Sequence, residues 1–328
     1  NSVAIGQNAV GLGVYTADNG VIIGNGAGYD LTSAESATLI GAFAGGNITT
    51  GDNIIAIGRL ALGSGISSGA ENIAIGTEAL NNVTSGSNTI ANITTGVQSI
   101  AIGLDTMGTG VVTGANNIAM GNVAGNDLTS ANDSILIGTQ AGTNITTAQN
   151  SIAFGELAMG VGIVTGTGNI AIGQAAAEDL TSADGSIFIG NYAGQQATTT
   201  TNSIAIGYQA MGTGVTTGDD NIAIGQLAGN DLTSGGGNVL IGKSAGENQT
   251  TPNDNVAIGN GCMALGTVTG GDNVIVGRRT AEDLTSGTYN VILGDMAGLN
   301  ATSFLQNVVI GKNALGAGVA TGESNVVI

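Results

Sequence analysis

Short apolar runs that end on a glycine recur along the whole chain, and polar, glycine-rich segments separate them. One copy reads Asn-Ile-Ala-Ile-Gly from Asn221 to Gly225. The β-branched residues alternate with a period of two, and glycine is abundant, which favours strands over helices. We therefore predict that each apolar run is a short β-strand closed by a glycine corner.

The strand-closing glycines follow one another at regular intervals. Successive intervals of eighteen, seventeen and seventeen residues make one superperiod, which separates Gly121, Gly173, Gly225 and Gly277. Three types of polar segment alternate within it, containing Thr-Gly, Asp-Leu-Thr-Ser or Asn-x-Thr-Thr. These residues form turns, because glycine adopts positive φ and short polar side chains bond the local backbone.

This repeat predicts an all-β fold, a parallel β-solenoid (β-roll) of about eighteen rungs. A single repeat unit is too short to bury an apolar face, whereas stacked units can do so. At about 4.8 Å per rung the stack would be on the order of 85 Å long. Because the last residues repeat the start of a strand, we expect residues 1–328 to be a single elongated solenoid domain within a longer fibre.

One interval departs from the repeat. The step from Gly76 to Gly103 is longer than one coil, but it is seven residues too short for two full coils. We expect a shortened or irregular rung near residues 77–99, bulged out of the stack.

The predicted strands are apolar on both faces, so one set of side chains must fill the coil and the other must be covered from outside. We assign Ile222 and Ile224 to the coil interior and the middle residue to an outer stripe. Such a stripe suits packing against copies of the chain, most economically in a trimer. The alternative is a monomeric coil whose own second sheet covers it. This self-association stripe comprises Ala119, Leu136, Ala171, Phe188, Ala223, Leu240 and Ile292.

An asparagine or serine precedes most of the strand-closing glycines by four residues. If the coils stack in register, these side chains form a polar ladder in which each bonds its neighbour in the next rung. We predict a structural role for the ladder, which includes Asn117, Ser134, Ser151, Asn169, Asn221, Asn238, Asn255 and Asn273.

Charge and composition limit the chemistry. The chain has 23 acidic and 5 basic residues, a formal net charge of −18, and no histidine. The acidic excess opposes binding to nucleic acid, and no apolar run approaches the roughly 18 residues of a membrane span, so we expect neither nucleic-acid binding nor membrane insertion. Without histidine the usual general base and the commonest zinc ligand are missing, and we expect a non-enzymatic protein without cofactors.

A column of aspartates in the second turn type raises the alternative of calcium binding. Its members are three rungs apart, roughly 14 Å, so they cannot share an ion within one chain. An Asx turn is the simpler interpretation of Asp30, Asp127, Asp179, Asp231 and Asp283.

Asn-x-Thr sequons mark the third turn type. An exposed turn would permit glycosylation, although the same residues are also good turn formers. The candidate acceptors are Asn47, Asn92, Asn144, Asn248 and Asn300.

The segments Asn1 to Gly6, Asn-Ser-Val-Ala-Ile-Gly, and Asn202 to Gly207, Asn-Ser-Ile-Ala-Ile-Gly, resemble the head repeats of YadA-like trimeric autotransporter adhesins. The wider pattern also resembles repeats in phage tail fibres. This resemblance covers essentially the whole chain, although the adhesin repeat is shorter than the repeat found in this sequence. It implies a trimeric β-roll, an extracellular, cell-surface or virion location, and attachment to a host surface or matrix receptor.

These observations predict a structural extracellular fibre segment, the shaft or head of a trimeric adhesin or phage-type tail fibre. One alternative is the subunit of a helical surface filament built by self-association. Another is an ice-binding solenoid, because threonines recur once per superperiod at Thr113, Thr165, Thr217, Thr269 and Thr321.

Overall fold

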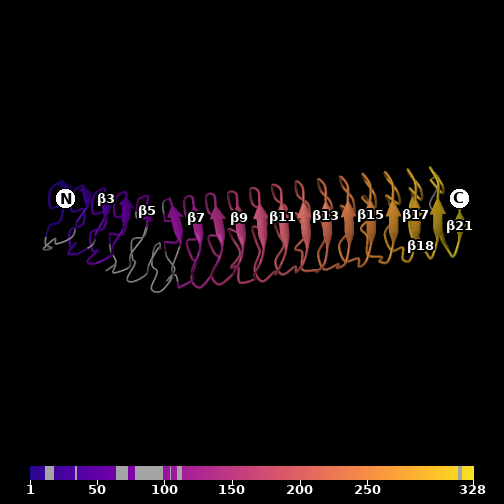
Figure 1. Ribbon diagram of the computed structural model, residues 1–328. Coiled ribbons are helices and arrows are strands. Elements are labelled where there is room, and N and C mark those ends of the chain that lie inside the picture. The colour runs from indigo at the N-terminus through magenta and orange to yellow at the C-terminus, as the bar shows by residue number, and fades with distance from the viewer. Residues whose placement is uncertain are drawn as a thin grey trace. The chain divides into compact units, whose positions relative to one another are not determined.

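The computed structural model describes residues 1–11, 18–33, 35–63, 73–77, 99–103, 105–108, 113–316 and 320–328. The chain divides into two compact units, Asn1–Gly168 and Asn169–Ile328. Strands and turns make up the described part of both units, and no helix occurs there. Each unit stacks its strands coil upon coil, with one strand per repeat, so the predicted parallel β-solenoid is confirmed (Figure 1).

The first unit contributes nine strands of three residues each to a parallel sheet. Neighbours pair without a register shift, as where Ile118 lies opposite Ile135 and Ala119 opposite Leu136. The strands are β1 (Val3–Ile5), β2 (Val21–Ile23), β3 (Thr38–Ile40), β4 (Ile55–Ile57), β5 (Ile73–Ile75), β6 (Ile100–Ile102), β7 (Ile118–Met120), β8 (Ile135–Ile137) and β9 (Ile152–Phe154).

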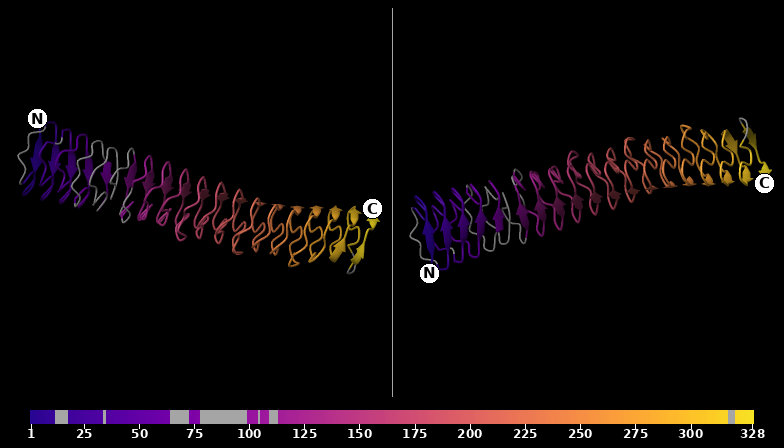
Figure 2. Two further views of the ribbon diagram at one scale, coloured as in Figure 1. Left: turned by 90° about the horizontal axis from the view of Figure 1, so that it is seen from below. Right: turned by 90° about the horizontal axis from the view of Figure 1, so that it is seen from above.

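The second unit continues the same pattern, with its strands along one side of the stack (Figure 2). Two further strands, β18 and β20, pair with each other in a separate small sheet. The strands are β10 (Ile170–Ile172), β11 (Ile187–Ile189), β12 (Ile204–Ile206), β13 (Ile222–Ile224), β14 (Val239–Ile241), β15 (Val256–Ile258), β16 (Val274–Val276), β17 (Val291–Leu293), β18 (Ala301–Leu305), β19 (Val308–Ile310), β20 (Ala320–Glu323) and β21 (Val326–Val327).

The strands on either side of the long interval between Gly76 and Gly103 are direct neighbours in the sheet. Strand β5 pairs directly with β6, with Ala74 opposite Ala101 and Ile75 opposite Ile102. The irregular rung predicted near residues 77–99 falls on residues 78–98, which lie outside the described part of the chain.

The orientation of the strands is the reverse of the predicted one. Ala223, Leu240 and Phe188 are fully buried within a single chain, whereas Ile224 is 36% exposed. The middle residue therefore points into the coil, and its two neighbours point outward. The same correction applies to the whole predicted stripe of Ala119, Leu136, Ala171, Phe188, Ala223, Leu240 and Ile292, which is buried in its own coil.

Packing inside the coil explains this orientation. A Cβ built on Gly229 would meet Leu240 at 2.8 Å and would lie 3.7 Å from both Ala223 and Met211. The interior of the coil is therefore narrow. Most coils place an alanine there, and a large side chain such as Leu240 fits only because the residue that it contacts is a glycine. Phe188 occupies the same place opposite Gly194.

Candidate self-association face

The first and third residues of each strand form an apolar surface on the outside of each unit, which we call the outer face. Parallel, in-register pairing aligns these residues in two columns, as where Ile222 lies opposite Val239 and Ile224 opposite Ile241. Several members are strongly exposed, including Phe154 at 51% and Val274 at 41%. The other exposed members are Val3, Ile5, Val21, Ile73, Ile100, Met120, Ile172, Ile224, Ile310 and Val326.

The outer face is a sizeable apolar surface. Three residues of a strand span about 10 Å and each rung adds about 4.8 Å, which gives about 50 Å² per rung. Nine rungs in one unit therefore present about 450 Å² of continuous apolar surface. The largest apolar patch on a typical soluble monomer covers about 300 to 600 Å² and is often functional, so the outer face has the size of an interaction site.

An acidic border precedes the outer face in the second unit. Its residues occupy the corner just before the buried ladder position, and we call them the leading border: Asp184, Asp219, Asp220, Asp254 and Asp272. Asp220, Asp254 and Asp272 have φ between 56° and 58°. Asparagine and aspartate tolerate this left-handed conformation best among residues other than glycine, so the corner geometry favours one or the other here.

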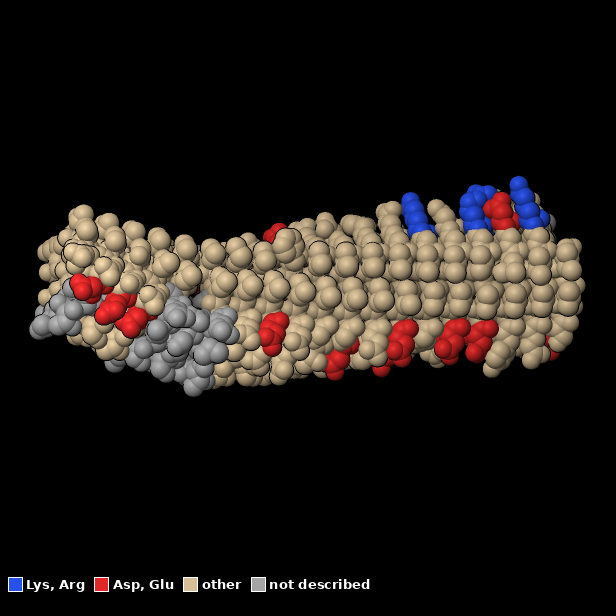
Figure 3. Space-filling model, viewed as in Figure 1, with Lys and Arg blue, Asp and Glu red and all other residues tan. Residues whose placement is uncertain are grey.

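Cationic side chains lie on the opposite side of the same face, immediately after the strand-closing glycines. We call Lys243, Arg278 and Lys312 the trailing border. In Figure 3 the cations project from one edge of the second unit and acids line the opposite edge. Asp295 occupies the same repeat position after Gly294, so the outer face of this unit is apolar in the middle, acidic along its leading side and of mixed, mostly positive charge along its trailing side.

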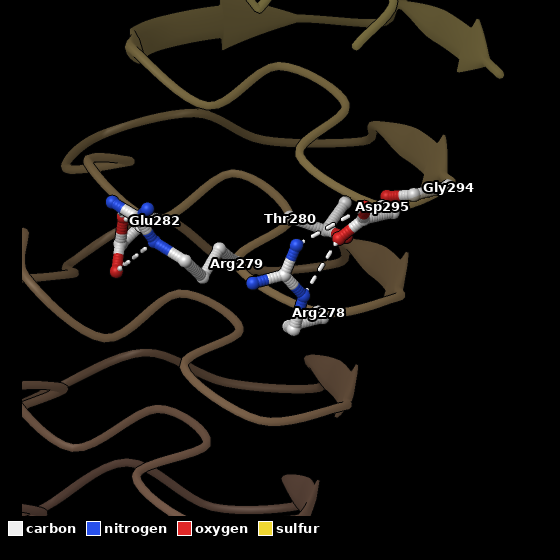
Figure 4. A network of polar contacts seen from close by, with 6 residues as sticks. All are labelled: Arg278, Arg279, Thr280, Glu282, Gly294 and Asp295. Carbon is white, nitrogen blue, oxygen red and sulfur yellow. Dashed lines mark hydrogen bonds and ion pairs between the residues drawn. The ribbon is translucent and has the colours of Figure 1, made fainter. Parts of the chain in front are cut away.

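The trailing border includes an ordered polar network (Figure 4). Arg278 donates through Nε and Nη2 to the two carboxylate oxygens of Asp295, at 2.9 and 3.2 Å. Arg279 binds Glu282 through contacts of 2.6 to 3.0 Å. Hydrogen bonding to Glu282, reinforced by its negative charge, raises the pKa of Arg279. The Arg278 side chain remains 53% exposed beside the outer face.

The polar ladder runs inside the coil, on the side of the leading border. The backbone N–H of Asn238 donates to Oδ1 of Asn221 at 3.0 Å, and its Nδ2 donates to the same oxygen at 3.0 Å. Nδ2 of Asn238 also donates to the carbonyl of Pro252 at 2.8 Å. Every predicted ladder residue is fully buried: Asn117, Ser134, Ser151, Asn169, Asn221, Asn238, Asn255 and Asn273.

The predicted sequons lie in turns where the asparagine amide already has a structural partner. Nδ2 of Asn144 donates to the carbonyl of Val161 at 2.7 Å, and Nδ2 of Asn248 donates to the carbonyl of Leu265 at 3.3 Å. Asn300 bonds Gly316 in the same way, at 3.2 Å. Asn47 also has a polar partner, and Asn92 lies outside the described residues.

Two of the aspartates considered for calcium, Asp127 and Asp231, have local partners. Asp231 accepts from Oγ1 of Thr213 at 2.6 Å and from Nδ2 of Asn230 at 3.2 Å. Within the described ranges, no three His, Cys, Asp or Glu side chains gather in a way that could hold a metal ion.

The charged borders were not recognised from the sequence alone, although a signal for them is present. The residue directly after a strand-closing glycine is a cation at Arg59, Lys243, Arg278 and Lys312, which are four of only five basic residues in the chain. Acids stand at the same repeat position at Glu156 and Asp295, so the sequence indicates an edge that gathers charge of both signs, mostly positive.

The chain matches no protein-family model, and no curated protein matches it in sequence. None of the described residues belongs to a helix that is long and apolar enough to span a membrane.

Proposed function

We propose that this chain is a structural, non-enzymatic fibre segment that associates with copies of itself through its outer face, as a homotrimer. The observation that carries the proposal is the continuous apolar outer face, with exposed members such as Phe154 and Val274. Removing apolar surface from water is favourable by about 25 cal/mol per Å², from which the entropic cost of association is subtracted. Covering the outer face therefore favours association.

The proposed contact surface is the one formed by the first and third strand residues. The alanine-rich stripe cannot serve, because Ala223 and its equivalents are buried by their own coil. A copy of the chain is a fitting partner, since its own outer face has the same two columns and the same spacing between rungs.

The proposed role is mechanical. The parallel strand ladder and the buried asparagine ladder hold successive coils in one register. A stack of this kind resists bending and local opening because each coil is bonded to the next throughout its length. Together with the resemblance to adhesin and tail-fibre repeats, this supports a shaft or head at a cell surface or on a virion, with a host surface or matrix receptor as the final target.

Two other functions use parts of the same structure. A helical surface filament would need the same outer face and differs only in the symmetry of association. Ice binding would need a regular array of free threonine hydroxyls along the predicted column. Thr113 of that column donates its hydroxyl to the carbonyl of Thr129 in the next coil at 3.4 Å, and Thr165 also has a polar partner, which favours the fibre over the ice-binding solenoid.

Analytical ultracentrifugation tests the proposal. We expect the chain to sediment at about three times its monomer mass of 31.7 kDa. The double variant Ile206→Lys/Ile224→Lys places charge on the outer face and should sediment as a monomer. Val215→Lys is the matched control, since Val215 is 53% exposed but lies on a turn away from the outer face. A wild-type monomer at micromolar concentration would refute the proposal.

A further inference from the structure

Two tyrosine rings meet at the surface of the second unit, just beyond the strands. Tyr192 and Tyr208 lie with their ring centres 6.1 Å apart and their planes at 87°, an edge-to-face arrangement. Tyr208 is 47% exposed, although aromatic residues make up only 3% of the chain. Tyrosine gathers at binding sites because it offers a large, stiff apolar ring with a polar end. An exposed pair of this kind is therefore a candidate binding site.

The backbone beneath both rings is fixed. The N–H of Tyr192 donates to the carbonyl of Gln174 in the preceding coil at 2.9 Å. The N–H of Leu227 in the next coil donates to the carbonyl of Tyr208 at 2.9 Å. The strands that lead into the two tyrosines, β11 and β12, pair without a register shift. The rings are thus held in place before a ligand arrives, and binding costs little conformational freedom.

Amide side chains surround the two rings. Because β11 and β12 pair in register, Asn191 follows its strand beside Tyr208, and Gln209 lies beside Tyr192, with about 4.8 Å between the two backbones. Gln226 occupies the position of Tyr208 in the next coil. Asn191 and Gln226 are exposed, and a side-chain amide both donates and accepts hydrogen bonds. We call Asn191, Tyr192, Tyr208, Gln209 and Gln226 the tyrosine patch.

The tyrosine patch is uncharged, although the chain carries a net charge of −18. Lys243, the next cation in the row of Tyr208 and Gln226, is two rungs from Tyr208, about 10 Å along the stack. Glu178, on the turn of the β10 coil, already accepts a hydrogen bond from Nε2 of Gln195 at 2.7 Å. An anionic ligand would find no cation here and would be repelled by the chain as a whole. The surroundings therefore favour a neutral ligand.

We infer that the tyrosine patch binds a neutral saccharide, with one sugar ring stacked on Tyr208 and its hydroxyls bonded by Asn191 and Gln226. A pyranose has an apolar C–H face, which suits an aromatic ring, and a rim of hydroxyls. Each hydroxyl donates and accepts, as the amides do. The inference goes beyond the proposed function, because the patch belongs to a single chain and does not require association.

The ring geometry argues against a proline-rich peptide, the other common ligand of exposed aromatic residues. Such peptides dock into grooves lined by aromatic side chains. The planes of Tyr192 and Tyr208 are nearly perpendicular, so the two rings form no pair of facing walls. One exposed ring bordered by amides fits a sugar better.

Titration with neutral oligosaccharides tests the inference. Cellohexaose, maltohexaose and chitohexaose are added to the full chain, and binding is followed by tyrosine fluorescence, since the chain has no tryptophan. Saturation-transfer NMR shows which sugar protons contact the protein. We expect at least one of the three to bind with a Kd on the order of 1 mM, as is reasonable for one sugar ring on an open surface. Hexagalacturonate, which carries a carboxylate on every ring, should bind more weakly. Failure of all three neutral sugars, or tighter binding of the acidic one, would overturn the inference.

Substitutions at the exposed ring locate the binding. Tyr208→Ala should weaken binding about threefold to tenfold, because it removes the stacking surface. Tyr208→Phe keeps the ring and should keep most of the affinity, whereas Tyr208→Leu keeps apolar bulk without a flat face and should lose it. Tyr289→Ala is the matched control, since Tyr289 is 59% exposed but precedes β17 at the opposite corner of the coil. Equal losses in Tyr208→Ala and Tyr289→Ala, or full affinity in Tyr208→Leu, would refute stacking on Tyr208.

Sedimentation separates this inference from the proposed function. Tyr208→Ala should sediment as the wild type does, because the tyrosine patch lies beyond the outer face. If Tyr208→Ala dissociates the assembly, a second copy covers the patch, and the inference fails while self-association stands. If the wild type is a monomer that still binds the oligosaccharide, the proposed function fails and the inference stands.

Discussion

At the scale of single residues, the strand-closing glycines are the least replaceable positions. Gly225 has φ of 136°, and a Cβ at this position would collide with the carbonyl oxygen of Gly242 in the next coil. Both the backbone conformation and the close approach exclude other residues. The repeat of glycine is thus a geometric requirement of stacking, because every coil must turn under the carbonyl of its neighbour.

Gly225→Ala should destabilise the protein by about 2 kcal/mol or more, from the left-handed conformation and the backbone clash together. Gly236→Ala is the control, because Gly236 has no positive φ and the nearest atom to its Cβ would be 3.1 Å away, at the carbonyl oxygen of Asp219. Urea unfolding followed by circular dichroism measures the difference. Similar losses in the two variants would contradict the geometric explanation.

The ladder also depends on individual side chains. Asn238→Ala leaves the backbone N–H of Asn255 and the carbonyl of Pro252 without their partners, which should cost about 1 to 3 kcal/mol. Asn238→Ser should cost less, because Ser134 and Ser186 occupy the same place in the equivalent coils and accept from the next N–H. The free energies of unfolding of both variants test this order, which a purely volume-dependent effect would not produce.

The single cysteine makes stability depend on alkaline pH. Burial raises the pKa of the Cys262 thiol from 9.0 to about 12, so the folded state holds its proton where the unfolded state loses it. Stability is fully present below pH 9 and falls by about 1.4 kcal/mol per pH unit between pH 9 and 12. Cys262→Ala, which restores the alanine found at Ala228 and Ala245, should show a smaller loss over that range in denaturant titrations. An identical pH dependence in both proteins would exclude the thiol as its source.

At the scale of the strand, side chains alternate between the coil interior and the outer face. Each three-residue strand therefore has one core residue between two surface residues. Leu240 is fully buried, whereas Val239 and Ile241 on either side are partly exposed. Large-to-small substitution in a core leaves a cavity that the surroundings only partly fill. Truncation of a side chain that points into the coil should therefore lower the free energy of unfolding much more than truncation of one on the outer face of the same strand.

Leu240→Ala should cost about 2 to 5 kcal/mol, because it empties the space next to Gly229. Val239→Ala, on the outer face of the same strand, should cost about 1 kcal/mol or less in a chain kept monomeric by dilution. Thermal unfolding of both variants gives the comparison. A larger effect at Val239 would mean that the strand is oriented as the sequence pattern first suggested.

The strands, their spacing and the position of the ladder followed from periodicity, since a period of two and a glycine corner have few structural solutions. The direction of the side chains did not follow, because Ile222, Ala223 and Ile224 are all apolar and alternation cannot tell inside from outside. The side-chain volume of the middle residue of each strand distinguishes the two orientations. A large middle residue that stands between alanine coils, such as Leu240 or Phe188, contacts a glycine, at Gly229 or Gly194, which only an interior position explains.

At the scale of the whole molecule, charge and apolar surface act against each other. Each chain carries a net charge of −18, so the proposed trimer would carry three times that charge, which opposes the proposed contact through the outer face. The Debye length falls from about 30 Å at 0.01 M salt to about 10 Å at 0.1 M. Salt therefore weakens the general repulsion while it leaves the apolar contribution in place.

Association should consequently tighten as salt rises from about 0.01 M to about 0.3 M, measured as the dissociation constant by sedimentation equilibrium. The few opposite charges at the borders would be screened too, but three trailing cations against a net charge of −18 make repulsion the stronger of the two effects. Lys243→Gln/Lys312→Gln should steepen the salt dependence, because it adds to the repulsion and removes attraction. Weaker association at higher salt would instead mean that ion pairs, and not the isoleucine and valine columns, hold the copies together.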